Sequence, residues 1–252
     1  MTKIIVAKQI NKSFYSASEQ VHVLKNISVT IHQGEFVSIM GPSGSGKSTL
    51  LYALSGLDTI DTGDVAFLGQ SLTACNENEL ADIRRQRMGF VFQQPTFLKN
   101  LTLLDNILLP AMKDARKQVK TLTERAQQLM NQTGIGDLTL RMTSEVSGGQ
   151  LQRAGICRAL VNGPVIVFGD EPTGALNSKA TQEIINLFKD IHNEGTTVLI
   201  VTHDTKVAAQ SEHVLFMKDG QIFDELQFNK QVNETLERRI ERVTDKMLTL
   251  EV

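Results

Sequence analysis

Residues 41–49 form a glycine-rich stretch whose residue types suit the binding of phosphate groups. Because glycine lets the backbone curl, successive N–H groups can face one anion, which the positive end of a following helix also attracts. Lys47 would reach the outer phosphates, and the Ser48 hydroxyl would bind Mg²⁺. The stretch therefore predicts a site for a nucleoside triphosphate. It reads Gly41, Pro42, Ser43, Gly44, Ser45, Gly46, Lys47, Ser48 and Thr49.

Two adjacent acidic residues, Asp170 and Glu171, suit the hydrolysis of such a nucleotide. They end the apolar run 165–169, which is typical of a buried strand of a parallel sheet. We expect Asp170 to hold Mg²⁺ and Glu171 to orient and polarise the attacking water. An acidic pair after a strand can also be a solvated start of a loop, but the phosphate-binding stretch upstream favours the catalytic interpretation.

His203 follows a third apolar run, residues 197–202. A histidine at a strand end is often structural. However, parallel strands end at a shared edge of the sheet, so this imidazole could also contact the γ-phosphate.

A second candidate phosphate-binding element lies about a hundred residues after the first. A serine that caps a helix, followed by exposed backbone amides, can hold an anion. The element comprises Ser147, Gly148, Gly149 and Gln150 and precedes a helix-forming run.

The order of these motifs resembles that of the ATP-binding-cassette (ABC) ATPases over residues 1–225. The resemblance implies an α/β fold, a P-loop NTPase core with a mostly parallel sheet. It also implies an inserted α-helical subdomain at about 95–160, while strand signals at 4–7 and 27–31 suggest an antiparallel β-layer before the phosphate loop. The matching motifs are Walker A (41–49), the Gln loop (90–93), the signature (146–150), Walker B with its glutamate (165–171), the D-loop (174–177) and the switch histidine (203).

The resemblance also implies roles and partners. Phe14 matches the aromatic residue that stacks on adenine, with neighbouring Tyr15 as the alternative, and Gln93 contacts Mg²⁺ or the lytic water. Glu171, His203, Gln93 and Lys47 are then catalytic, and ATP and Mg²⁺ are the cofactors. Each ATP lies between the Walker A of one copy and the signature of a second copy, which makes an ATP-sandwich homodimer.

Closer details are similar to the ATPases of lipoprotein-releasing, macrolide-export and bacitracin-type antimicrobial-peptide resistance transporters. The stretches that carry this similarity are 34–41, 88–94 and 170–176. The similarity implies an integral-membrane permease as partner. Two alternatives remain, an ATPase of a force-transmitting complex of the cell-division type and a soluble ABC ATPase that acts on nucleic acid. The net charge of −2 argues against direct nucleic-acid binding.

Two residues depart from the family pattern. Val146 replaces the usual leucine of the signature but keeps an apolar contact, so we expect little consequence. Asn177 replaces the usual aspartate of the D-loop, which removes a charge and keeps a side chain of similar shape.

Length and composition favour one large domain, since 252 residues with 41% hydrophobic content can bury a full core. Cys75 and Cys157 are far apart and lack the spacing of a metal site, so we expect reduced thiols. No run approaches the ~18 apolar residues of a membrane span. We therefore expect a cytoplasmic protein, peripheral on the inner face of the membrane, that contacts the membrane only through the permease.

Each of two segments has two alternative interpretations. The apolar segment 96–112 is either plain core or partly a groove for a permease helix. In the extension 226–252, apolar residues recur every three or four positions, which predicts an amphipathic helix. This helix packs either on its own domain or on a partner. The apolar residues are Leu236, Ile240, Val243, Met247 and Leu250.

Overall fold

The computed structural model describes residues 2–16, 19–228 and 234–251. The chain divides into two compact units. Unit 1 comprises Met1–Leu80 and Thr197–Val252, and unit 2 comprises Ala81–Thr196. The phosphate loop and His203 belong to unit 1, whereas the acidic pair and the signature belong to unit 2.

An antiparallel sheet of order β2-β1-β4-β5 lies in unit 1. This is the expected antiparallel layer, but its first two strands are much longer than the apolar runs 4–7 and 27–31. The second half of β1 lacks an alternating apolar pattern but continues to pair with β2 through several register shifts. Backbone hydrogen bonds therefore extend the hairpin beyond the apolar signal. The strands are β1 (Lys3–Ser16), β2 (Glu19–His32), β4 (Thr62–Phe67) and β5 (Gln70–Ser71).

A second group of strands in unit 1 runs in the order β10-β9-β3-β8. β3 pairs in parallel with both β8 and β9, and every residue of β3 and β8 is buried. This burial on both faces explains their continuous apolar sequences. The elements are β3 (Phe36–Met40), α1 (Lys47–Leu54), β8 (Thr197–Val201), α7 (Thr205–Ala208), β9 (His213–Lys218) and β10 (Gln221–Gln227).

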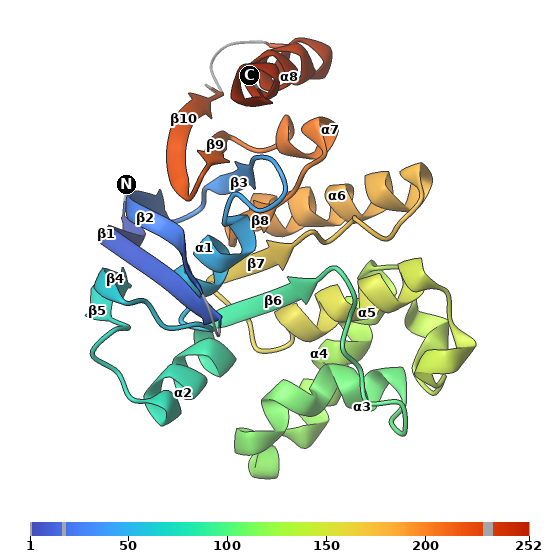
Figure 1. Cartoon of the computed structure of the whole chain (residues 1–252). Helices are drawn as coiled ribbons and strands as arrows, with labels where there is room; N and C mark the ends of the chain where they lie inside the picture. Colours follow the sequence, from blue (N-terminus) through green and yellow to red (C-terminus); the bar gives the residue numbers. More distant parts are fainter. Residues whose placement is uncertain (1, 17–18, 229–233, 252) are drawn as a thin grey trace. The chain divides into compact units, whose positions relative to one another are not determined.

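The expected amphipathic helix is α8 (Leu236–Glu251), and it packs on its own unit. Val243 is fully buried, and Ile240 and Met247 pack against a cluster that includes Ala208 of α7 and Phe228. Figure 1 shows α8 beside α7 and β10. Residues 229–233 and 252 of the extension and the side chain of Leu250 lie outside the described part of the chain.

Unit 2 contains two parallel strands, β6 (Met88–Phe92) and β7 (Ile166–Asp170). The rings of Phe90 and Phe168 stack with their centroids 5.4 Å apart. The strands are preceded by the charged helix α2 (Glu77–Arg87) and followed by α6 (Ser178–Asn193).

Helices fill the sequence between β6 and β7 and share one apolar cluster. Leu103, Ile107 and Ala111 of the segment 96–112 are buried in this cluster, whereas Leu98 and Met112 are exposed. Much of that segment is therefore core. The helices are α3 (Leu103–Leu108), η1 (Leu109–Lys117), α4 (Val119–Gln132), η2 (Gly136–Leu138), η3 (Thr143–Glu145) and α5 (Gly148–Leu160).

Cys75 and Cys157 both carry free thiols, as expected. Burial raises the pKa of the Cys157 thiol to about 11. Within the described ranges, no helix has both the length and the apolar character needed to span a bilayer.

Candidate functional site

The phosphate loop of unit 1 leaves the buried strand β3 and enters α1. Gly41, Gly44 and Gly46 all have positive φ angles. A Cβ atom at Gly41 would lie 2.1 Å from the carbonyl oxygen of Met217, and one at Gly46 would lie 2.7 Å from the carbonyl oxygen of Val23. Both positions therefore require glycine, because a neighbouring carbonyl group leaves no room for a side chain and because the φ angle is positive.

The loop has the chemistry that an anion needs. Gly46 is the N-cap of α1 and has no side-chain cap, so the first amides of the helix depend on other acceptors. Lys47 folds back over the loop and donates to the carbonyl oxygens of Gly41 and Pro42 at 2.9 and 2.8 Å. The buried Ser45 hydroxyl has no hydrogen-bond partner among the described residues. These features fit a triphosphate group.

His203 lies at the same sheet edge as the phosphate loop. Val201 at the end of β8 pairs in register with Ile39 of β3, and the Thr202 amide donates to the Ile39 carbonyl oxygen at 3.1 Å. The exposed imidazole therefore follows β8 where the loop follows β3. The expected shared edge is confirmed within unit 1.

Phe14 and Tyr15 near the end of β1 point to opposite sides of the strand, as successive residues must. The Phe14 ring is 46% exposed and lies beneath the Lys12 ammonium, 5.1 Å from the ring centroid. Tyr15 is 75% exposed, and its hydroxyl accepts a hydrogen bond from Gln20. Phe14 contacts the buried residue Lys12, whereas Tyr15 contacts the exposed residue Gln20. Phe14 is therefore the better candidate for stacking on a base.

In unit 2, the acidic pair and the glutamine share one strand edge. Phe92 at the end of β6 pairs with Asp170 at the end of β7, so Gln93 and Glu171 each come one residue later. Glu171 has a φ of 47°, which is unusual for a residue with a side chain and costs on the order of 1 kcal/mol. Such local strain is common at functional sites.

Further contacts fix the glutamine and its strand. A Cβ at Gly174 would lie 2.9 Å from Nε2 of Gln93, so this glycine makes room for the amide. The buried side chain of Gln152 donates to the Phe92 carbonyl oxygen at 2.9 Å. Gln152 therefore links the helix after the signature to the segment that carries Gln93.

The signature begins α5 with a capping box. Ser147 accepts a hydrogen bond from the Gln150 amide, and the Gln150 side chain accepts one from the Ser147 amide. Asn177 caps α6 in the same way by accepting from the Ala180 amide at 2.9 Å. Residues of both helix starts line one pocket of about 430 Å³ in unit 2, including Ser147, Gly148, Gly149, Gln150, Ala175 and Asn177.

Three residues near these motifs were not predicted from the sequence. They are Arg153, Glu183 and Gln152. Arg153 of α5 donates to Glu183 of α6 at 2.5 Å, and this contact joins the two helices that flank the pocket. Arg153 also donates to the Thr133 carbonyl oxygen at 2.6 Å. Each has partners 20 to 60 residues away, so no local pattern identifies them.

Comparison with known proteins identifies the family. The family model for ABC transporters matches residues 24–174, more than half of the chain. The chain belongs to the ABC transporter family. The expected ATPase class is thereby confirmed, and the antiparallel layer and parallel-rich sheet are those of an ABC ATPase.

Curated relatives agree with this assignment. The macrolide export ATP-binding/permease protein MacB of Aggregatibacter actinomycetemcomitans is 42% identical over 224 residues, which are 89% of this chain and 35% of that protein. The MacB protein of Shigella flexneri is 42% identical over 88% of this chain and 34% of its own length. The chain thus spans about a third of the length of these relatives.

Solved structures share the fold. The ATP-binding cassette MJ0796, in a dimeric post-hydrolysis state bound to ADP and Pi, is 37% identical with a TM-score of 0.84, over 90% of this chain and 99% of that chain. Its dimeric structure, described as a bacterial ABC transporter cassette, is 38% identical with the same TM-score and the same coverage. Family and relatives together favour a transporter ATPase over the nucleic-acid and force-transmitting alternatives.

Proposed function

We propose that this ABC ATPase binds Mg-ATP and hydrolyses it to drive an export permease. The phosphate loop carries this proposal, because a side chain at Gly41 or Gly46 would clash with backbone atoms, and the loop amides and Lys47 suit a triphosphate. The residues that contact the nucleotide are Phe14, the loop residues Gly41, Pro42, Ser43, Gly44, Ser45, Gly46, Lys47, Ser48 and Thr49, and the signature residues Ser147, Gly148, Gly149 and Gln150.

Each catalytic group has a separate role. Ser48, Asp170 and Gln93 would provide oxygen ligands for Mg²⁺, a cation that commonly binds proteins through one or two carboxylates together with substrate phosphates. When bound, Mg²⁺ would neutralise charge that develops on the transferred phosphoryl group. Glu171 accepts the proton of the attacking water as a general base. His203 and Lys47 stabilise charge on the γ-phosphate.

The names of the relatives support a membrane partner for this chain. The curated relatives are named as macrolide export ATP-binding/permease proteins, and the part that matches this chain is about a third of their length. We propose an integral-membrane permease as the partner of this chain, with the ATPase held through it at the cytoplasmic face of the membrane. Exposed apolar residues of the segment 96–112, Leu98, Leu109 and Met112, are suitable for that contact.

Phosphate release and ATP binding by the purified chain test this function. Glu171→Gln should keep ATP binding and lower single-turnover hydrolysis by about two to four orders of magnitude, the scale of a lost general base. Lys47→Ala should weaken binding itself. The matched control is Glu194→Gln, an exposed carboxylate at the end of α6, which should hydrolyse ATP like the wild type. A Glu171→Gln protein with the wild-type rate would disprove the assignment of the base.

A further inference from the structure

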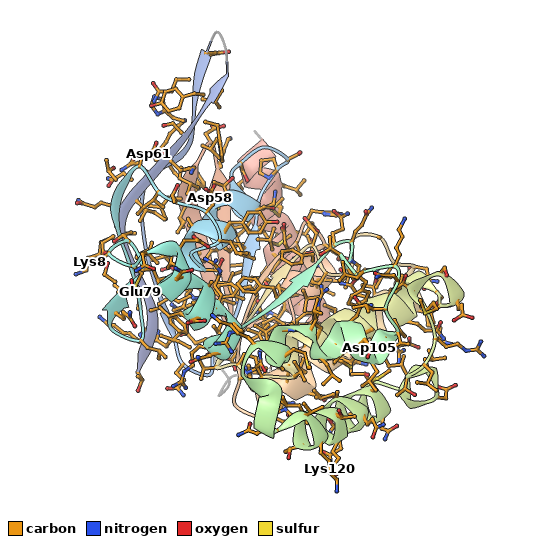
Figure 2. The ribbon with its side chains drawn as sticks, turned by 90° about the horizontal axis from the view of Figure 1, so that it is seen from below. Lys8, Asp58, Asp61, Glu79, Asp105 and Lys120 are labelled. Carbon is orange, nitrogen blue, oxygen red and sulfur yellow. The ribbon has the colours of Figure 1, made fainter. Side chains whose placement is uncertain are left out.

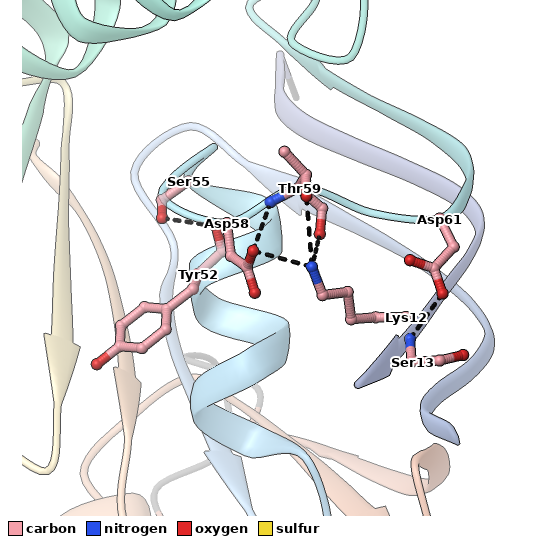
Figure 3. A network of polar contacts seen from close by, with 7 residues as sticks. All are labelled: Lys12, Ser13, Tyr52, Ser55, Asp58, Thr59 and Asp61. Carbon is pink, nitrogen blue, oxygen red and sulfur yellow. Dashed lines mark hydrogen bonds and ion pairs between the residues drawn. The ribbon is translucent and has the colours of Figure 1, made fainter. Parts of the chain in front are cut away.

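Lys12 is a buried lysine that no motif accounts for. Its side chain is 9% exposed, yet its ammonium has a complete set of partners. Nζ donates to Oδ1 of Asp58 at 2.9 Å, to the Thr59 carbonyl oxygen at 2.6 Å and to the Thr59 hydroxyl at 3.4 Å. A buried ammonium is costly unless its charge and its three donors are satisfied, and this contact set satisfies all of them (Figure 3).

The same ammonium is the neighbour of the Phe14 ring. Residues 12 and 14 are on one side of β1, and Nζ of Lys12 lies 5.1 Å from the ring centroid. A cation at this position is attracted to the electron-rich face of an aromatic ring. Lys12 therefore restrains the orientation of a half-exposed ring.

The residues that hold Lys12 are themselves fixed to the end of α1. The amides of Leu57 and Asp58 donate to the Tyr52 carbonyl oxygen at 2.9 and 3.2 Å. Three residues further along, Asp61 accepts a hydrogen bond from the Ser13 amide at 2.7 Å. Figure 2 labels Asp58 and Asp61 on the segment that follows α1. The strand that carries Phe14 is thus tied at two successive residues to this segment.

α1 begins at the phosphate loop and ends at this segment. Its first residue is Lys47, and its last turn includes Tyr52. A rigid helix of eight residues therefore separates the phosphate-binding amides from the residues that hold Lys12. This arrangement sets the position of the Phe14 ring relative to the phosphate loop within unit 1.

We propose that Lys12, held by Asp58 and Thr59, is a positioning residue that orients Phe14 for stacking on the nucleotide base. The proposal rests on the proposed function, since it requires a nucleotide whose phosphates occupy the loop. The proposal makes different predictions for the base and for the triphosphate of the nucleotide. Binding of the base depends on Lys12, whereas binding of the triphosphate by the loop does not.

Binding of two probes to the purified chain tests the proposal. Mg-ATP and Mg-tripolyphosphate share the phosphates, but only ATP has a base. Lys12→Met should raise the Kd of Mg-ATP roughly tenfold and leave that of Mg-tripolyphosphate within about twofold, because the loop is intact. Asp58→Asn keeps the side-chain volume and should act in the same direction, which provides a second variant if Lys12→Met does not fold. Lys3→Met, an exposed lysine on the same strand, is the control.

A double-mutant cycle separates positioning from general stability. In a Phe14→Ala background, Lys12→Met should have no further effect on the Kd of Mg-ATP. Equal weakening of both probes would show a structural role for Lys12 and overturn the proposal, as would an unchanged Kd of Mg-ATP. A wild-type chain that binds neither probe would instead contradict the proposed function.

Discussion

At the residue scale, Asn177 shows how a departure from the family pattern can be tolerated. Its side chain caps α6 by accepting a hydrogen bond from the Ala180 amide, and an aspartate would cap equally well. Asn177→Asp should therefore change the free energy of unfolding by less than about 0.5 kcal/mol. The ATPase rate should shift only modestly. Urea denaturation and steady-state phosphate release measure the two effects, and complete loss of activity would show that the site depends on the amide.

The two thiols should differ in reactivity. Cys157 is fully buried and its raised pKa of about 11 keeps it protonated at neutral pH, whereas Cys75 is partly exposed. A thiol reagent at pH 8 should therefore label one cysteine per native chain and two per unfolded chain. Mass spectrometry identifies the labelled residue. Rapid native labelling of Cys157 would contradict the packing of its helix.

Sequence analysis could place the candidate residues that directly follow a strand. Apolar runs indicate the strands, and parallel strands end at one edge of the sheet. His203 confirms this logic, since Val201 pairs with Ile39 beside the phosphate loop. Residues that act through distant partners could not be predicted. Lys12 contacts a residue 46 positions away, and Gln152 contacts a carbonyl 60 positions away, so folding alone brings them together.

At the element scale, sequence periodicity found α8 but could not reveal its polar contacts. Lys246 of α8 pairs with Asp224 of β10, and Arg239 and Arg242 lie over the Phe228 ring, 4.8 and 5.0 Å from its centroid. The lengths of β1 and β2 were also missed, because residues 11–16, which include only two neighbouring aromatic residues, carry no alternating apolar signal. In both cases, the side-chain contacts of α8 and the pairing of β1 with β2, the interactions join residues that the local sequence pattern does not relate.

The Lys246–Asp224 pair gives a pH-dependent contribution to stability. The hydrogen bond from Lys246 lowers the pKa of Asp224 below its ordinary value of 3.8. A lowered pKa stabilises the fold at pH values above the ordinary value, and this stabilisation is lost as the pH falls through the folded value. Both side chains are about a third exposed, so solvent screens the pair and its contribution should be below about 1 kcal/mol.

Lys246→Met tests this contribution. At pH 7 the variant should be less stable than the wild type by up to about 1 kcal/mol in urea denaturation. The difference should stay constant from pH 7 down to about the ordinary value of 3.8, and shrink as the pH falls further. It should also shrink in 1 M salt. A difference that grows at low pH would show that the carboxylate is not the stabilising partner. Lys120→Met, on an exposed side chain of α4, is the control.

At the scale of the whole molecule, the two phosphate-binding elements belong to different units of one chain. Walker A lies in unit 1 and the signature pocket in unit 2. The cassette MJ0796, which this chain resembles, is dimeric with ADP and Pi bound. We therefore propose that two copies assemble around two ATP molecules, each ATP held by the Walker A of one copy and the signature of the other.

Light scattering of Glu171→Gln with and without Mg-ATP tests this central claim most directly. Because bound ATP completes both interfaces and this variant should hydrolyse it only slowly, the mass should change from monomer to dimer when Mg-ATP is added. Ser147→Arg in the same background should remain monomeric and still bind ATP, whereas Ser144→Arg, outside the pocket, should dimerise. A mass that stays monomeric at high protein concentration, or a dimer that Ser147→Arg does not affect, would contradict the account.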